Sequence, residues 1–541
     1  MRLLLIIAFI GLLVFQTANA QKNTAPERPK LVVGIVVEGM RPDFIRRFWD
    51  NYGSNGFKRL VTKGKVYKNA EYDYLYPESA AAYATLITGS NPATHGIIGN
   101  NWYNQLTKKY VHSVEDEKYR ILGSTASGKG NSPAELLCST LGDELRLSNY
   151  KQSKVFSIAL KDYAAVLSAG HAGSGAFWYD VPSGNWVSSN YYFSVLPAWV
   201  KRFNNRNLSE IYLGQTWNTF YSLTQYNGLG DDNAYEKGFA GGGHIFPYEM
   251  PKMRYKNNNY ELLHSTPFGN TMVREFAVSA LVNEKLGKDK HPDLLTVSFS
   301  ANAGVADRFG LRSVEIEDIY IRLDQEIESF LDFIDDFVGL ENTLVYLTAD
   351  RGSEDMPSFL TDIRFPVQNF NRRGAEFLTK SYLKAVYEKN YLIDEFTKSG
   401  IYFDRELLEK SEITISEIQN RTALFLTDFS GIAHTYSAAG LETGAFSQGN
   451  YMSAQKQYIR KRSPDVLIEF KPGTIDSDGE FTSSGNRNYL NVPLIFYGWK
   501  IEPGERVRKV SPADIAPTLS AILQISYPNA STGTPLFDLQ E

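Results

Sequence analysis

The sequence is poor in two of the side chains that most often bind metal ions in proteins. It has a single cysteine, Cys138, which excludes an internal disulfide. Within the helix-like stretch SPAELLCSTLGDELRLS, with Ser132 as N-cap, this thiol is expected to be a small buried apolar group. Histidine occurs seven times, at positions 95, 112, 171, 244, 264, 291 and 434, and never after position 434. A metal site that drew ligands from the last hundred residues would therefore have no imidazole there.

The chain also lacks an excess of positive charge. It has 56 Lys and Arg against 61 Asp and Glu, a net charge of −5 and a pI near 5.9. A nucleic-acid partner would require a basic face, so this composition argues against one. With 43% apolar and 22% charged residues, the composition is that of an ordinary globular protein.

Long apolar runs are confined to the N-terminus. One basic residue, an apolar run from Leu3 to Phe15 and the small residues Ala18-Asn19-Ala20 predict a signal peptide over 1–20, with a mature chain over 21–541. The run is short for a membrane span, so we expect no membrane span after cleavage. The expected location is the periplasm, the cell surface or the medium, and the lack of disulfides fits a bacterial envelope.

Short β-branched runs without alternation predict buried parallel strands at 31–37, 154–160, 293–300, 343–349 and 492–498. Helix-like segments lie between them, including a long amphipathic one over 313–338 and a last one that opens at Asp514. This alternation predicts an α/β fold: a doubly wound, mostly parallel sheet with helices on both faces. Two stretches, about 172–265 and 356–480, break the rhythm and are expected to be insertions or caps over the carboxyl edge of the sheet.

Six blocks in this order resemble one family: LVVGIVVEGMRPDF, YPESAAAYATLITGSNPATHGIIGNNWY, SIALKDY, SFSANAGVADRFG, LTADRG and VPLIFYGW. They are similar to the alkaline phosphatase superfamily, nearest to the secreted phosphate-irrepressible bacterial alkaline phosphatases and the nucleotide pyrophosphatase/phosphodiesterases. The resemblance implies the alkaline-phosphatase-like fold. It also implies phosphoryl transfer at two zinc ions, one activating a Ser or Thr nucleophile and the other stabilising the leaving oxygen.

Carried over by position, the resemblance places the family's first strand-end aspartate on Glu38 and its nucleophile on Ser79. The phosphate-contacting Asn falls on Asn100 or its neighbour. The family's Lys-Asp-Arg clamp becomes Lys161-Asp162-Tyr163, so the lysine remains and the arginine is lost.

The metal ligands implied by the resemblance are largely missing. The pattern Asp-x-x-x-His falls on Ala303 and Asp307, the Asp-His pair falls on Asp350 and Arg351, and the last histidine falls on Ser484. Alanine has no donor atom, and a guanidinium is a permanent cation without a lone pair for a metal. We therefore predict that Arg351 occupies the place of a lost metal, in a salt-bridge network of Glu38, Asp307 and Asp350 with Arg351 and Lys161.

Three functions remain open at this point. The first is a pseudoenzyme with no cofactor that binds an unidentified ligand or envelope partner in the former active-site cleft. The second is an active phosphomonoesterase or phosphodiesterase with one divalent metal on Glu38, Asp307 and Asp350, since oxygen ligands favour Mg, Mn or Ca. The third is metal-free hydrolysis by Ser79, with Lys161 as base and Arg351 stabilising charge.

Overall fold

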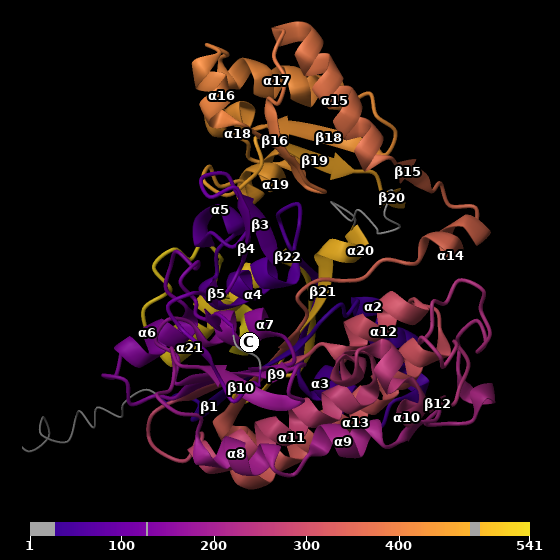
Figure 1. Cartoon of the computed structure of the whole chain (residues 1–541). Coiled ribbons are helices and arrows are strands. Elements are labelled where there is room, and N and C mark those ends of the chain that lie inside the picture. The colour runs from indigo at the N-terminus through magenta and orange to yellow at the C-terminus, as the bar shows by residue number, and fades with distance from the viewer. Residues whose placement is uncertain (1–26, 126–127, 477–486, 541) are drawn as a thin grey trace, which may run out of the picture.

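A ten-stranded sheet forms the centre of the protein in the computed structural model, which describes residues 27–125, 128–476 and 487–540 (Figure 1). The strand order is β22-β2-β21-β14-β1-β13-β8-β9-β10-β6. The strands are β1 (Leu31–Val37), β2 (Lys65–Glu71), β6 (Ile121–Leu122), β8 (Val155–Ala159), β9 (Gly175–Asp180), β10 (Asn185–Ser189), β13 (Asp293–Phe299), β14 (Thr343–Thr348), β21 (Asn491–Gly498) and β22 (Gly504–Val510). The predicted mostly parallel α/β sheet is confirmed.

The five central strands, β14, β1, β13, β8 and β9, run parallel to one another, with Val36 of β1 opposite both Ser298 and Thr348. Their carboxyl ends therefore meet at one edge, where open α/β folds place their binding sites. The prediction of a parallel strand at 492–498 is wrong. This strand, β21, is antiparallel to both β14 and β2; the chain reaches it from β14 only after the long segment that contains the cap, and its direction is set by these two partners.

Helices cover both faces of the sheet (Figure 1). On one side lie α4 (Ser79–Thr88), α6 (Leu141–Leu147), α7 (Asp162–Ala169) and α21 (Ile515–Leu523); on the other lie α11 (Pro267–Glu284), α12 (Ala301–Phe309) and α13 (Val314–Phe337). The long helix predicted over 313–338 is confirmed as α13. The helix predicted from Ser132 begins only at Leu141, because Thr140 and Asp143 form a capping box there.

Residues 357–476 form a separate lobe above the sheet edge, hereafter the cap (Figure 1). It has its own sheet, β16 (Ile393–Phe396), β17 (Gly400–Phe403), β19 (Val466–Phe470) and β18 (Ile432–Ser437), and its own apolar core. Helices α15 (Arg372–Tyr387), α16 (Arg405–Lys410), α17 (Ile415–Leu426), α18 (Ala438–Thr443) and α19 (Gly449–Gln457) pack on this sheet, with α14 (Pro357–Asp362), β15 (Gln368–Phe370) and β20 (Thr474–Asp476) at its base.

The cap is held to the body by the hairpin of β3 (Asn101–Asn104) and β4 (Lys109–His112). Tyr103 donates to Asp394 at 2.9 Å and Lys108 contacts Asp404 at 2.8 Å. The predicted cap over the carboxyl edge is thus present in this part of the chain.

The other predicted insertion, 172–265, is placed differently from the expectation. Its first part is β9 and β10 of the main sheet, so the boundary at 172 is wrong. Its remainder contains α8 (Ala198–Asn204), α9 (Leu208–Leu213), α10 (Met250–Met253), β11 (Thr216–Trp217) and β12 (Tyr248–Glu249). This part lies beside α11 and α13, away from the cap (Figure 1). Within the described ranges, no helix is both long and apolar enough to cross a membrane.

Candidate functional site

The ends of β1 and β14 bring two buried carboxylates to one place. Asp350, two residues after β14, is fully buried; its Oδ1 accepts from the Gly39 N–H at 2.8 Å and its Oδ2 accepts from Ser79 Oγ at 2.6 Å. Glu38, directly after β1, accepts from Tyr83 Oη at 3.2 Å. Both oxygens of Asp350 are therefore already engaged by donors of the chain.

Ser79 occupies the first position of α4 and is 5% exposed. The next residue, Ala80, donates its N–H to Asn100 Oδ1 at 2.8 Å, which holds the predicted phosphate-contacting amide against the start of the helix. Tyr163, which stands where the family clamp has arginine, lies beside Ser79, with its ring centroid 6.3 Å from that of Tyr83 on α4. A hydroxyl at this helix end lies in a field that favours a bound anion.

Arg351 faces the site, as predicted from its place in the sequence. Its Nε lies 3.8 Å from Asp350 Oδ2, and its guanidinium lies over the Tyr489 ring at 5.1 Å. Burial lowers the pKa of Arg351, but the neighbouring Tyr489, Asp350, Asp307 and Glu38 outweigh it and raise the pKa above its usual value. The guanidinium therefore stays charged, one residue beyond the strand-end aspartate.

The charge balance differs from the predicted five-member network. Burial, together with the charge of Asp350, raises the pKa of Glu38 to about 8. Lys161, just before α7, lies near enough to oppose this shift, but no ion pair joins it to Glu38 among the described residues. Near neutral pH the two cations, Arg351 and Lys161, thus face the carboxylate of Asp350 and, beside Ser79, that of Glu78, whose Oε2 accepts from the Asn100 N–H at 2.9 Å.

Two predicted members lie elsewhere. Asp307 is exposed on α12 and contributes to the site only through its charge, because the turn of the helix carries its side chain outward. Ala303, on the same helix, approaches Gly39 but offers no donor atom. Ser484 lies outside the described residues.

Zinc, expected from the resemblance, does not fit this set of residues. In the described part of the chain, no three His, Cys, Asp or Glu side chains gather as a metal site would require. The residues that would bind two ions here are an alanine, an arginine, an exposed aspartate and an aspartate engaged by two donors. A single ion on Glu38, Asp307 and Asp350 is also unsupported, since Asp307 lies apart from the buried pair.

One residue of the site was missed from the sequence. His264 is 7% exposed, and neither ring nitrogen has a hydrogen-bond partner. Burial, helped by the charge of Lys161, lowers its pKa well below the usual value, so it is a neutral imidazole beside an ammonium. Nothing in the polar stretch around it signals this position.

A cleft of about 540 Å³ opens from this site toward the cap. Ser79, Asn100 and Arg351 line its inner end, and Arg372 and Lys398 of the cap line its outer end. Its lining is mixed, and the aromatic residues in it are Tyr76, Trp102, Tyr103, Tyr110, Tyr402, Phe470 and Tyr489. A ligand with an anionic group at the Ser79 end and an apolar or ring-shaped body matches this lining.

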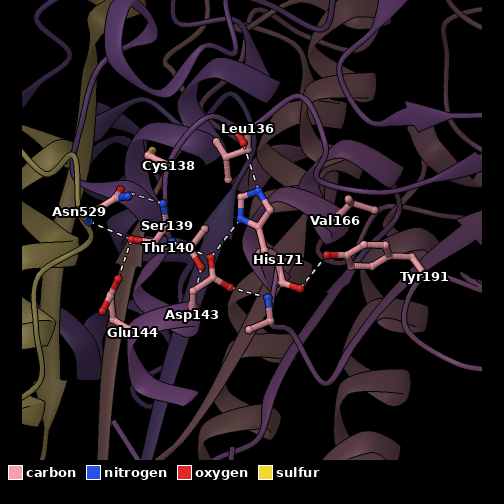
Figure 2. A network of polar contacts seen from close by, with 12 residues as sticks. Leu136, Cys138, Ser139, Thr140, Asp143, Glu144, Val166, His171, Tyr191 and Asn529 are labelled. Carbon is pink, nitrogen blue, oxygen red and sulfur yellow. Dashed lines mark hydrogen bonds and ion pairs between the residues drawn. The ribbon is translucent and has the colours of Figure 1, made fainter. Parts of the chain in front are cut away.

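A second, shallower cleft of about 410 Å³ lies near the start of α6 (Figure 2). His171 contacts Asp143 through Nδ1 at 3.2 Å and donates from Nε2 to the Leu136 carbonyl at 3.1 Å (Figure 2). The hydrogen bond to Asp143 raises the pKa of His171. Because both ring nitrogens are engaged, this histidine clamps a loop to a helix rather than acting as a base.

Comparisons with known proteins agree with this architecture. Residues 32–478 match the family described as type I phosphodiesterase / nucleotide pyrophosphatase. The chain is 34% identical over 558 residues to alkaline phosphatase PhoV of Synechococcus elongatus, covering 100% of both chains. It is 34% identical over 518 residues, 94% of each chain, to a protein of Myroides odoratus named calcium-transporting ATPase.

A third relative has a solved structure. Alkaline phosphatase PafA of Elizabethkingia meningoseptica is 33% identical over 537 residues, 98% of each chain. The PafA crystal structure superposes with a TM-score of 0.89 at 32% identity, covering 96% of this chain and 100% of that one.

Proposed function

The chain belongs to the type I phosphodiesterase / nucleotide pyrophosphatase family within the alkaline phosphatase superfamily, and we propose that it is an exported pseudoenzyme. In this proposal it binds the anionic group of a phosphate ester in the family's cleft and does not hydrolyse it by two-metal catalysis. The observation that carries the proposal is the position of Arg351, charged and next to Asp350 at the inner end of the cleft.

The contacts around Arg351 support binding without a metal. A guanidinium can donate two parallel hydrogen bonds to a phosphate, and such charge-assisted bonds are among the strongest in proteins. The Asn100 amide and the N-terminus of α4 lie at the same end of the cleft and favour the same negative group. The aromatic residues of the lining then select the body of the ester rather than free phosphate.

The test combines binding with turnover. Phenylphosphonate, a phosphate-ester analogue that cannot be hydrolysed, should bind the purified chain in calorimetry, and Arg351→Met should weaken it about tenfold or more. Arg460→Met, at an arginine of the cap whose side chain is 81% exposed, is the matched control and should leave affinity unchanged. A stoichiometric bound metal together with Ser79-dependent hydrolysis of p-nitrophenyl phosphate would overturn the pseudoenzyme.

One observation favours a second function, metal-free ester cleavage by Ser79. Its hydroxyl already donates to Asp350, whose pKa burial raises, so this carboxylate can accept the proton while Ser79 Oγ attacks phosphorus and the ester oxygen leaves. Asp350 would take the role that the sequence assigned to Lys161, which makes no hydrogen bond to Ser79 among the described residues. Hydrolysis that persists in excess chelator and disappears in Ser79→Ala would support this function.

A further inference from the structure

Two buried carboxyl groups and one half-buried carboxyl group, away from the cleft, have no counter-charge among the described residues. Asp231 and Glu236 lie in the glycine-rich segment 228–247, and Glu315 lies in the first turn of α13. Glu315 is fully buried and Glu236 is 7% exposed. Each of the three has one buried carboxylate oxygen without a hydrogen-bond partner: Asp231 Oδ1, Glu236 Oε2 and Glu315 Oε2.

The three groups converge on Tyr248, the first residue of β12. Tyr248 Oη donates to Glu315 Oε1. Burial raises the pKa of Tyr248, and the charges of Glu315, Asp231 and Glu236 raise it further. Asn233 holds the other oxygen of Glu236 at 2.8 Å. Backbone bonds also join this loop to Arg308 and Arg312, just before α13, so the three acids lie in one region of the fold, hereafter the Tyr248 cluster.

The segment that carries two of these acids is fixed in place by backbone bonds. Leu229 N–H donates to the Arg312 carbonyl at 3.2 Å, and Lys237 N–H donates to the Arg308 carbonyl at 2.8 Å. Gly238 has φ +62, and a Cβ there would lie 2.2 Å from the Gly243 carbonyl oxygen, so the turn admits only glycine. Asp231 and Glu236 are therefore carried by a loop whose backbone conformation is fixed.

Positive charge is missing around this cluster. In the described ranges neither Asp231, Glu236 nor Glu315 forms an ion pair with Lys or Arg; the nearby His244 contacts the exposed Asp232 at 3.0 Å. Burial and mutual repulsion raise the pKa of Glu315 to about 8 and that of Glu236 to about 7. Burying such groups ionised and unpaired is strongly unfavourable, so either protons or a cation must neutralise them.

We propose that the Tyr248 cluster binds one calcium ion through Glu236 and Glu315, with the ion's remaining ligands drawn from Asp231, neutral oxygens of the same loop and water. Calcium takes six to eight oxygen ligands in flexible geometry and accepts carbonyl and water oxygens beside a few carboxylates. Such a site does not require three acidic side chains around one point, and none of the described residues form one. The absence of His and Cys at the free oxygens disfavours zinc.

The experiment uses the full chain freed of divalent ions with chelator. Titration with CaCl₂ should give a calorimetric isotherm with a Kd of about 0.1–1 mM, the range of extracellular calcium sites, and saturating calcium should raise Tm by a few degrees. MgCl₂ at the same concentration should raise Tm less, because Mg²⁺ demands a compact octahedral shell. The difference in Tm with and without calcium is the readout, so a change in basal stability does not mask it.

Glu236→Gln and Glu315→Gln should each weaken calcium binding at least tenfold. Glu317→Gln is the matched control: it lies on the same helix and is buried, but its carboxylate already accepts from Asn51 and Asn227. It should keep the calcium-dependent rise in Tm. If a Gln variant fails to fold, the unmodified chain can be titrated with terbium. Terbium bound at the cluster should emit when Tyr248 or the adjacent Trp217 is excited, and calcium should displace it and remove this emission.

A flat calcium isotherm and an unchanged Tm in the unmodified chain would overturn the site and assign the neutralisation to protons. Equal calcium responses in Glu315→Gln and the unmodified chain would overturn it too, because binding would then lie elsewhere. Neither result depends on the phosphate-ester cleft.

Discussion

The strand-end site and the Tyr248 cluster both bury carboxylates, which is unfavourable unless a positive charge or a proton accompanies them, and they meet this need in opposite ways. At the strand ends, Asp350 has two hydrogen-bond donors and a covalently attached cation in the next residue. In the Tyr248 cluster, Glu315 and Glu236 each keep one oxygen that has no hydrogen-bond partner within the described part of the chain. The first arrangement is complete within the chain, whereas the second depends on what the solvent supplies, either protons or a cation.

The pair of Asp143 and His171 stands between these two extremes. Its cation is part of the chain but carries its charge only below the raised pKa of the imidazole. The three sites thus differ in the cation beside the buried acid: a permanent one at the strand ends, a titrating one beside Asp143, and none from the described residues in the Tyr248 cluster. Substitutions at each site can test whether this difference controls their stability.

The largest effect is expected from Asp350→Ala. The substitution leaves the Gly39 N–H and the Ser79 hydroxyl without their acceptor and Arg351 without its counter-charge, which should lower the free energy of unfolding by about 3–5 kcal/mol. Urea denaturation measures it. Asp350→Asn keeps an oxygen acceptor and nearly the same shape and should lose less; equal losses in the two variants would show that the charge, which both remove, governs the strand-end site and that the hydrogen bonds add little.

Arg351→Met should make the strand-end site resemble the Tyr248 cluster. With the cation gone, we expect the free energy of unfolding at pH 7 to fall by about 1–3 kcal/mol. The loss should shrink at pH 5, because the buried acids then take up protons. A loss that stays constant with pH would mean that Arg351 acts through packing on Tyr489 alone.

Without calcium, Glu315→Gln should change the free energy of unfolding in the opposite direction from Asp350→Asn. The pKa of Glu315 is raised to about 8 from an ordinary value near 4.5, so the unfolded chain releases this proton first as pH rises. The unmodified protein therefore loses stability between about pH 4.5 and 8. The amide removes that dependence and should leave the free energy of unfolding unchanged or up to about 1 kcal/mol higher at pH 8; a clear loss there would contradict it.

The smallest effect is expected at His171. The pKa of His171 is raised in the folded state above its unfolded value near 6.5. The stability that comes from its contact with Asp143 is therefore fully present below pH 6.5 and disappears as pH rises through the folded value. The imidazole is more than a third exposed, so solvent screening should keep the contribution below about 1 kcal/mol. Thermal melts of the unmodified chain and His171→Gln should differ at pH 5.5 and coincide at pH 9.

The sequence was sufficient for the features that depend on local pattern. Unbroken β-branched runs gave the central strands, and the residues that follow them, Glu38 and Asp350, meet because carboxyl ends of parallel strands share an edge. An insertion or cap over about 356–480 was also predicted, and the described residues 357–476 of this stretch form a lobe with its own sheet. The placement of Arg351 against Asp350 followed from adjacency alone.

Features that depend on long-range contacts were beyond the sequence. The antiparallel direction of β21 depends on its partners β14 and β2, not on its own apolar residues. The outward position of Asp307 depends on the rotation of α12. The Tyr248 cluster joins residues about eighty positions apart, in a loop whose glycines signal turns but not which carboxylates they bring together.

Under the proposed function, the position of Arg351 also sets what a two-metal site at this sheet edge would require. A histidine at this position would remove the built-in cation from beside Asp350, while Ala303 supplies no metal ligand and Tyr163 no guanidinium. We therefore expect Arg351→His alone to lower stability without providing a metal site, so that several simultaneous changes would be needed.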